Sequence, residues 1–292
     1  MKDAAKLSAY FAAVVLVGAI LAPLLFWSAQ LLAAHGVLTF LTHYNFESFF
    51  HRALLITALV LLWPLVRSLH LRSFRDLQLE KNPHGLRDVV AGLLLSGLPL
   101  ASAGIVLILA KIFLLKTAIP WSSVGAITAA AAVVPLIEET FFRGLILGIL
   151  SRDLRVPVAT FLSSFLFAIV HFLKAPNRTS ELVTWYSGFK SIAHSFGQFA
   201  DPIMVLAAFA TLFLLGWILA DARLRTRSLW LSIGLHSGWI FVSGIAVKMT
   251  KRPEILPWLG RNLLVGLVPL GLALISWILM FVWLRYENRK HA

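Results

Sequence analysis

Long apolar runs alternate with short polar and basic segments along the whole chain. A run of about 20 apolar residues can cross the hydrocarbon layer of a bilayer as an α-helix, which satisfies its backbone hydrogen bonds internally. The runs are continuous and not alternating, so they do not fit the strands of a membrane β-barrel. The pattern predicts an all-α, polytopic transmembrane helical bundle with about eight spans. The predicted spans are residues 8–34, 50–66, 89–115, 122–150, 156–173, 202–221, 229–247 and 263–284.

Composition agrees with this class, because 59% of the 292 residues are hydrophobic and only 13% are charged. A net charge of +13 would suggest a nucleic-acid partner in a soluble protein. Here Lys and Arg lie mainly between the apolar runs, so we interpret them as topology signals and expect the lipid bilayer, not nucleic acid, as the partner. The chain contains no cysteine, which excludes disulfides, thiolate nucleophiles and Cys-based metal sites.

The basic residues also predict an orientation. Loops on the side of the two termini, including residues 67–88, carry more Lys and Arg than the loops on the other side. By the positive-inside rule, both termini are expected in the cytoplasm of a multi-pass protein of the cell membrane, taken here as a bacterial inner membrane. Residues 36–52 and 175–200 are too polar to span and are predicted to lie along the outer face as interfacial helices.

Two carboxylates stand apart, because Glu138 and Glu139 fall inside a predicted span while the other acidic residues fall in loops or at span ends. A charged side chain at the bilayer centre costs about 3 kcal/mol even on lenient insertion scales. Glu139 and Arg143 are four residues apart with the acid first, which is the favourable order for an ion pair on a helix. Glu138 is rotated by about 100° from Glu139 and needs a partner from another span.

Two histidines also fall inside predicted spans. His171 follows Phe167 by one helical turn, and His236 has small neighbours that permit close helix approach. The rise of about 1.5 Å per residue puts Glu138, His171 and His236 all within the hydrocarbon layer, so they can share one cavity. An isolated intramembrane histidine is more often a hydrogen-bonding residue between helices, and Glu139 with Arg143 is best interpreted as a structural clamp. An unpaired Glu138 with two buried histidines favours function.

At these residues the chain resembles the CPBP family, which contains the CAAX-prenyl-processing type II endopeptidases and the bacteriocin-processing or self-immunity proteins. The matching residues are Glu138, Glu139 and Arg143 in the first motif, Phe167 and His171 in the second, and His236 in the third. The third motif has a polar residue four positions after its histidine, and here that residue is Ile240, which cannot hydrogen-bond through its side chain.

The resemblance implies a glutamate-dependent intramembrane endopeptidase without a cofactor or metal, acting on a membrane-associated protein or peptide. In this interpretation Glu138, assisted by His171, activates a water, and His236 donates to the oxyanion. With Ile240 at the position of the polar partner, the oxyanion hole is either weaker or completed by Ser237, Ser243 or another donor.

The remaining motif residues and the domain limits follow from the same resemblance. Glu139 is counted with the catalytic set, while Arg143 and Phe167 give structural support. The predicted catalytic core is 122–247, preceded by N-terminal transmembrane helices at 1–121 and followed by the last span and a cytoplasmic tail at 248–292.

Two other classes of function stay open from the residues alone. Glu138, His171 and His236 are an acceptable ligand set for a catalytic zinc, although the sequence has no His-Glu-x-x-His motif. A non-catalytic immunity or scaffold protein, or a transporter with Glu138 as proton carrier, is the alternative outside enzymes. The chain shows no internal repeat, which disfavours the transporter, and Ile240 gives the scaffold interpretation some support.

Overall fold

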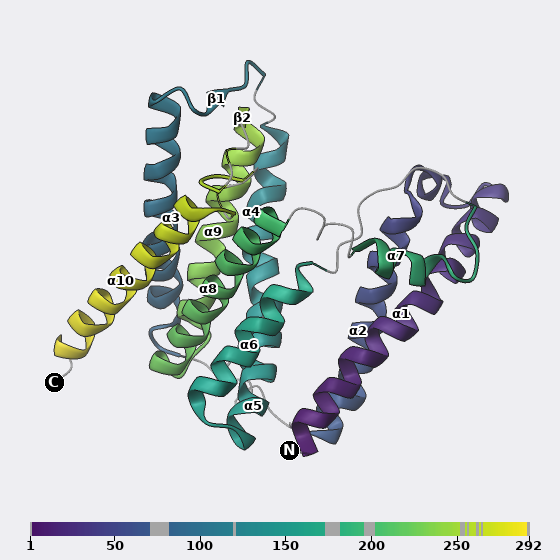
Figure 1. The fold of residues 1–292 in the computed structure, drawn as a ribbon, viewed down its shortest axis with the longest axis horizontal. Coiled ribbons are helices and arrows are strands. Elements are labelled where there is room, and N and C mark those ends of the chain that lie inside the picture. The colour runs from purple at the N-terminus through teal and green to yellow at the C-terminus, as the bar shows by residue number, and fades with distance from the viewer. Residues whose placement is uncertain are drawn as a thin grey trace. The chain divides into compact units, whose positions relative to one another are not determined.

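The computed structural model describes most of the chain as α-helix. The described residues are 2–70, 82–118, 121–172, 182–195, 202–251, 255, 257–260, 263 and 265–290. They form two compact units (Figure 1). Unit 1 comprises Met1–Arg72 and Ile169–Ala200, and unit 2 comprises Ser73–Ala168 and Asp201–Ala292. The two units are defined by compactness alone. The domain boundaries predicted from the sequence, after residues 121 and 247, therefore remain predictions.

Unit 1 is built on a helical hairpin. Its elements are α1 (Lys2–Ala34), a 3₁₀ turn (Thr39–His43), α2 (Phe46–Ser68) and α7 (Ser187–Ser195). The helices α1 and α2 pack through small and aromatic residues, with Ala19, Ala22, Phe50 and Ala53 fully or almost fully buried. Small residues let two helix backbones approach closely. The short α7 lies against α1 at Gly188, where a methyl group would collide with the backbone of Ala19.

Unit 2 holds the remaining helices. They are α3 (Gly85–Leu109), α4 (Ser122–Glu139), a π-helical segment (Thr140–Ile146), α5 (Leu147–Asp153), α6 (Val156–Val170), α8 (Pro202–Thr226), α9 (Trp230–Met249) and α10 (Leu267–Lys290). Two short strands, β1 (Leu114–Leu115) and β2 (Thr250–Lys251), pair antiparallel. The apolar core draws on α3, α8, α9 and α10, with Leu100, Leu219, Leu235 and Met280 buried in one cluster.

Glycines set the distance between α3 and α9, which run side by side (Figure 1). A Cβ atom at Gly92 would lie 2.6 Å from the carbonyl oxygen of Leu231, and one at Gly234 would collide with the Val89 carbonyl. This close approach of small residues is the packing mode that membrane helices favour, because lipid supplies no hydrophobic force between them. It fixes α9, which carries His236, against α3.

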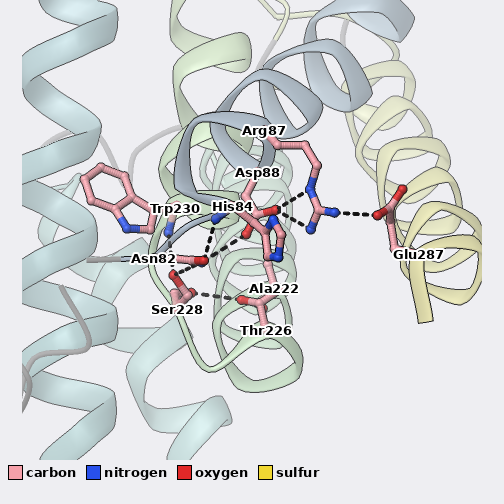
Figure 2. A network of polar contacts seen from close by, with 9 residues as sticks. All are labelled: Asn82, His84, Arg87, Asp88, Ala222, Thr226, Ser228, Trp230 and Glu287. Atoms are coloured by element: carbon pink, nitrogen blue, oxygen red, sulfur yellow. Dashed lines mark hydrogen bonds and ion pairs between the residues drawn. The ribbon is translucent and has the colours of Figure 1, made fainter. Parts of the chain in front are cut away.

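Polar contacts join the ends of three helices of unit 2 (Figure 2). The amide of Asn82 donates to Asp88 at 3.3 Å and to Ser228 at 3.4 Å. Arg87 donates to Asp88 at 3.1 Å and also pairs with Glu287 on α10. The contacts therefore tie the start of α3 to the turn between α8 and α9 and to the end of α10.

The all-α membrane architecture predicted from the apolar runs is confirmed, and the protein is multi-pass. Six helices of the described part are long and apolar enough to span a bilayer. They are Asp3–Ala34, Phe46–Ser68, Gly85–Leu109, Pro202–Thr226, Trp230–Met249 and Leu267–Glu287. The count of eight is not confirmed, because α6 has only 15 residues and the helix that follows Ser122 becomes π-helical after Glu139.

The two segments predicted as interfacial differ from that expectation in extent. Residues 36–52 form a short 3₁₀ turn and then the first turns of α2, instead of one separate helix. Within 175–200, α7 is helical, and residues 175–181 and 196–200 lie outside the described part. Their position along the outer face of a membrane stays a prediction.

Candidate active site

Glu138 and Glu139 are the last two residues of α4, directly before the π-helical segment. Pro135, one turn earlier, lacks an amide hydrogen and so cannot donate to the carbonyl four residues back. In the π-helical segment the Phe142 carbonyl accepts a hydrogen bond from Ser163 Oγ on α6 at 3.2 Å. Single π-helical turns often occur at functional sites, because they change the direction in which side chains leave the helix.

Arg143 is fully buried and has partners on three sides. Its Nη1 donates to Glu139 Oε1 at 3.0 Å, and its Nη2 donates to the Gly216 carbonyl at 3.1 Å. The guanidinium carbon lies 4.3 Å from the centre of the Phe167 ring. The ion pair predicted from the four-residue spacing is therefore present, and a planar guanidinium suits this combination of ion pair, carbonyl contact and ring stacking.

Gly216 on α8 is a partner that sequence reasoning missed. A side chain there would bring a Cβ to 3.1 Å from the Cα atom of Ser164, so glycine allows α6 and α8 to approach. The closeness leaves the Gly216 carbonyl within reach of Arg143. A glycine in an apolar helix signals close packing, but nothing in the sequence assigns its carbonyl to a particular donor.

His236 on α9 connects the two glutamates. Its Nδ1 lies 2.8 Å from Glu139 Oε1, and the imidazole is almost fully buried. An ionised carboxylate only accepts hydrogen bonds, so Nδ1 is assigned the proton of this contact. Nε2 then faces Glu138, whose Oε2 lies 3.9 Å away. That distance is too long for a direct hydrogen bond.

The Glu138 side chain is 29% exposed, whereas that of Glu139 is wholly buried. Within the part of the chain that the structure describes, Oε2 of Glu138 has no hydrogen-bond partner. The two carboxylates differ in surroundings, although Oε2 of Glu139 also has no partner among the described residues: Oε1 of Glu139 accepts from Arg143 and His236 in a wholly buried site, and Glu138 is partly exposed. Two carboxylates in such different environments suit two different roles.

Residues 120–242 match the family described as type II CAAX prenyl endopeptidase Rce1-like. This match covers 123 of the 292 residues and supports the CPBP/CAAX protease family that the motifs resemble. The match supports a peptidase that works within the membrane, and the matched stretch contains all the motif residues from Glu138 to His236. The comparisons with curated proteins and with solved structures returned no match.

The residues of the second motif are divided between the two units. Phe167 belongs to unit 2, where its ring contacts Arg143 and lies 5.9 Å, centre to centre, from the His236 imidazole. His171 follows the end of α6, is exposed and belongs to unit 1. The expected meeting of His171 with Glu138 stays a prediction.

The two serines considered as replacements for the missing donor at Ile240 are both engaged within α9. Ser237 Oγ donates to the Ile233 carbonyl at 2.7 Å, and Ser243 Oγ donates to the Ile240 carbonyl at 3.3 Å. Each hydroxyl has a single hydrogen to donate. In this arrangement neither serine offers a donor to a substrate oxygen.

Metal ligation was the alternative for the same residues. Among the described residues, no three or more His, Asp or Glu side chains are grouped as a metal site. Glu138 and His236 supply two of the predicted zinc ligands, and the third, His171, belongs to the other unit. The zinc alternative therefore depends on the same predicted approach of His171 as the metal-free one.

Proposed function

We propose that this Rce1-like chain is an intramembrane endopeptidase that hydrolyses a peptide bond of a membrane-associated protein or peptide through a water activated by Glu138. The observation that carries the proposal is the unsatisfied Oε2 of Glu138, 3.9 Å from Nε2 of a histidine that Glu139 holds in place. Neither a thiolate nor a metal is needed for this chemistry, because a carboxylate can serve as general base and then as general acid.

In the proposed reaction the water lies between Glu138 and His236. Glu138 takes one proton as the water oxygen attacks the carbonyl carbon of the substrate. It then gives that proton to the leaving nitrogen as the carbon–nitrogen bond breaks, so that the carboxylate is regenerated. The products are a carboxylic acid and an amine, and no oxidant or further reactant is required.

Glu139 is proposed to orient His236. A carboxylate that accepts from Nδ1–H fixes the tautomer and rotation of an imidazole, as in the serine protease triad. If His236 enters the reaction neutral, its Nε2 accepts a hydrogen bond from the water. Donation from Nε2 to the oxyanion, the role that the resemblance implies, requires that His236 enters and leaves the reaction as an imidazolium. His171 is proposed as the second contact of the water.

The Glu138→Gln variant tests the proposal, because Gln keeps the size of the side chain but cannot accept the proton. Peptide termini in membranes of cells that express the wild type or a variant are compared by mass spectrometry, which detects cleavage of any membrane protein or peptide. New termini should appear with the wild type and with the control Glu287→Gln, whose carboxylate pairs with Arg87 at the end of α10. They should be absent with Glu138→Gln. Termini retained by folded Glu138→Gln protein would leave the binding or scaffold interpretation in its place.

Histidine variants separate the roles within this mechanism. His171→Ala should abolish cleavage, whereas His236→Ala should retain a trace if its loss costs one oxyanion donor, worth about a hundred- to a thousandfold. Elemental analysis of the same proteins addresses the zinc alternative. Stoichiometric zinc that is lost in either variant, together with inactivation by a chelator, would favour zinc.

A further inference from the structure

A cavity of about 360 Å³ lies within unit 1, between the end of α1, the connection to α2 and the short α7. Small-molecule sites in proteins span about 300–1,000 Å³, so this volume admits a small polar group. The cavity lining is mixed, with Phe26 and Phe46 among its apolar residues and Gln30, Asn45 and Ser191 among its polar ones. None of its lining residues is a residue of the proposed active site.

Glu47, the second residue of α2, lines this cavity and is only 6% exposed. Its Oε2 is buried and has no hydrogen-bond partner among the described residues. The start of a helix favours a negative charge, but a buried carboxylate also needs donors or a cation to offset its lost hydration. The structure thus presents an acceptor without a donor, which a cationic hydrogen-bond donor from outside the chain would complete.

Lys190 on α7 lines the same cavity and lies beyond hydrogen-bond distance of the Glu47 Oε2 atom. A carboxylate and an ammonium group that face one cavity match a ligand that itself carries both charges. His43 and His194 are the other titratable residues of the lining. The complementary ligand has an ammonium group for Glu47 and a phosphate for Lys190.

The position of the cavity along the helices identifies the source of such a ligand. It lies where α1 ends and α2 begins, and both helices are candidate membrane spans. Trp27 and Trp185 stack edge to face there with ring centres 4.6 Å apart. Tryptophan gathers at the headgroup layer of a bilayer. We therefore expect the cavity at the depth of the phospholipid headgroups.

We propose that this cavity binds a zwitterionic headgroup with a primary ammonium and a phosphate, as in phosphatidylethanolamine. Glu47 accepts hydrogen bonds from the ammonium, and Lys190 pairs with the phosphate. The primary ammonium distinguishes this lipid from phosphatidylcholine, whose trimethylated nitrogen has no hydrogen to donate.

The full-length protein is tested in nanodiscs that contain phosphatidylglycerol with either phosphatidylethanolamine or phosphatidylcholine. Native mass spectrometry counts the lipids that the released protein retains. The wild type should retain phosphatidylethanolamine about tenfold better than phosphatidylcholine, the scale of one charge-assisted hydrogen bond. Glu47→Gln should lose this preference. The control Asp3→Asn, at the opposite end of α1, should keep it.

Two further arms locate the contacts. Lys190→Met should weaken retention of both lipids equally, because the phosphate is common to them. If soluble phosphoethanolamine displaces the lipid, the headgroup alone is sufficient for binding. If it does not, the acyl chains of the intact lipid also contribute to binding. Either result agrees with the proposal when Glu47→Gln removes the preference for phosphatidylethanolamine. Equal retention of the two lipids by the wild type overturns the proposal even if Glu47→Gln does not fold. An unchanged preference in folded Glu47→Gln overturns it as well.

Discussion

Replacing Arg143 with alanine is the sharpest test of the buried network around Glu139. The substitution removes the donor at 3.0 Å from Glu139 Oε1, the donor at 3.1 Å from the Gly216 carbonyl and the cation over the Phe167 ring. Glu139 would keep only the contact with His236 among those described, although its side chain is wholly buried. The variant therefore strands a charge where water cannot replace the lost partner.

The expected loss is a large part of the total free energy of unfolding. Breaking a buried ion pair by removing one partner costs about 3–5 kcal/mol, against a typical total of about 5–15 kcal/mol. Arg143→Lys should cost less, because an ammonium keeps the charge but loses the planar fork that reaches Glu139 and Gly216 together. Glu139→Gln combined with Arg143→Met should cost less than the sum of the two single changes, by about 0.5–3 kcal/mol.

Thermal unfolding in detergent measures the effect, together with the folded yield after size-exclusion chromatography. Arg143→Ala should lower Tm by on the order of 10 °C. Arg225→Ala is a matched control, because Arg225 pairs with Asp221 at the same spacing and lies over the Phe281 ring, but its side chain is 44% exposed. Exposed pairs contribute about 0–1 kcal/mol. Equal Tm values for the two alanine variants would refute the argument from burial.

Two further predictions concern packing and topology. Gly234→Ala should lower the folded yield, because its methyl group would collide with the Val89 carbonyl, whereas Gly125→Ala has open space and should behave as the wild type; similar yields would show that α3 and α9 can separate at little cost. Reporter fusions after residues 80 and 190 should give opposite signals, because the Lys and Arg excess puts the first in the cytoplasm; matching signals would contradict the predicted orientation.

The helical architecture was predictable because hydropathy acts over whole segments. A run such as 202–221 has no stable alternative to a helix in lipid, so the α-helical class follows from composition and length. The interruption after Glu139 was not predictable in the same way. A π-helical turn depends on contacts such as Ser163 with the Phe142 carbonyl, which come from another helix. Predicting one straight span at 122–150 therefore missed the change of helix type beside the glutamates.

In the candidate site, too, contacts within one helix were predictable from the sequence and contacts between helices were not. Glu139 and Arg143 lie on one helix, so their spacing alone predicted the ion pair that the structure contains. The partner of Glu139 on α9 is 97 residues away in sequence, and no periodicity reports it. A carboxylate oxygen can accept more than one hydrogen bond, so an ion pair inferred from spacing does not reveal whether a second donor is present.

The double contact of Glu139 bears on the choice between a structural clamp and a catalytic residue. The same Oε1 accepts from Arg143 at 3.0 Å and from His236 at 2.8 Å, so one atom links the buried ion pair to the imidazole. Arg143 holds Glu139, and Glu139 in turn holds the ring whose Nε2 faces Glu138. Removing Arg143 should therefore disturb the orientation of His236 as well as stability. In the proposed mechanism the rigidity of the ion pair would serve catalysis directly, because a general base and its water must be held in a narrow range of geometries.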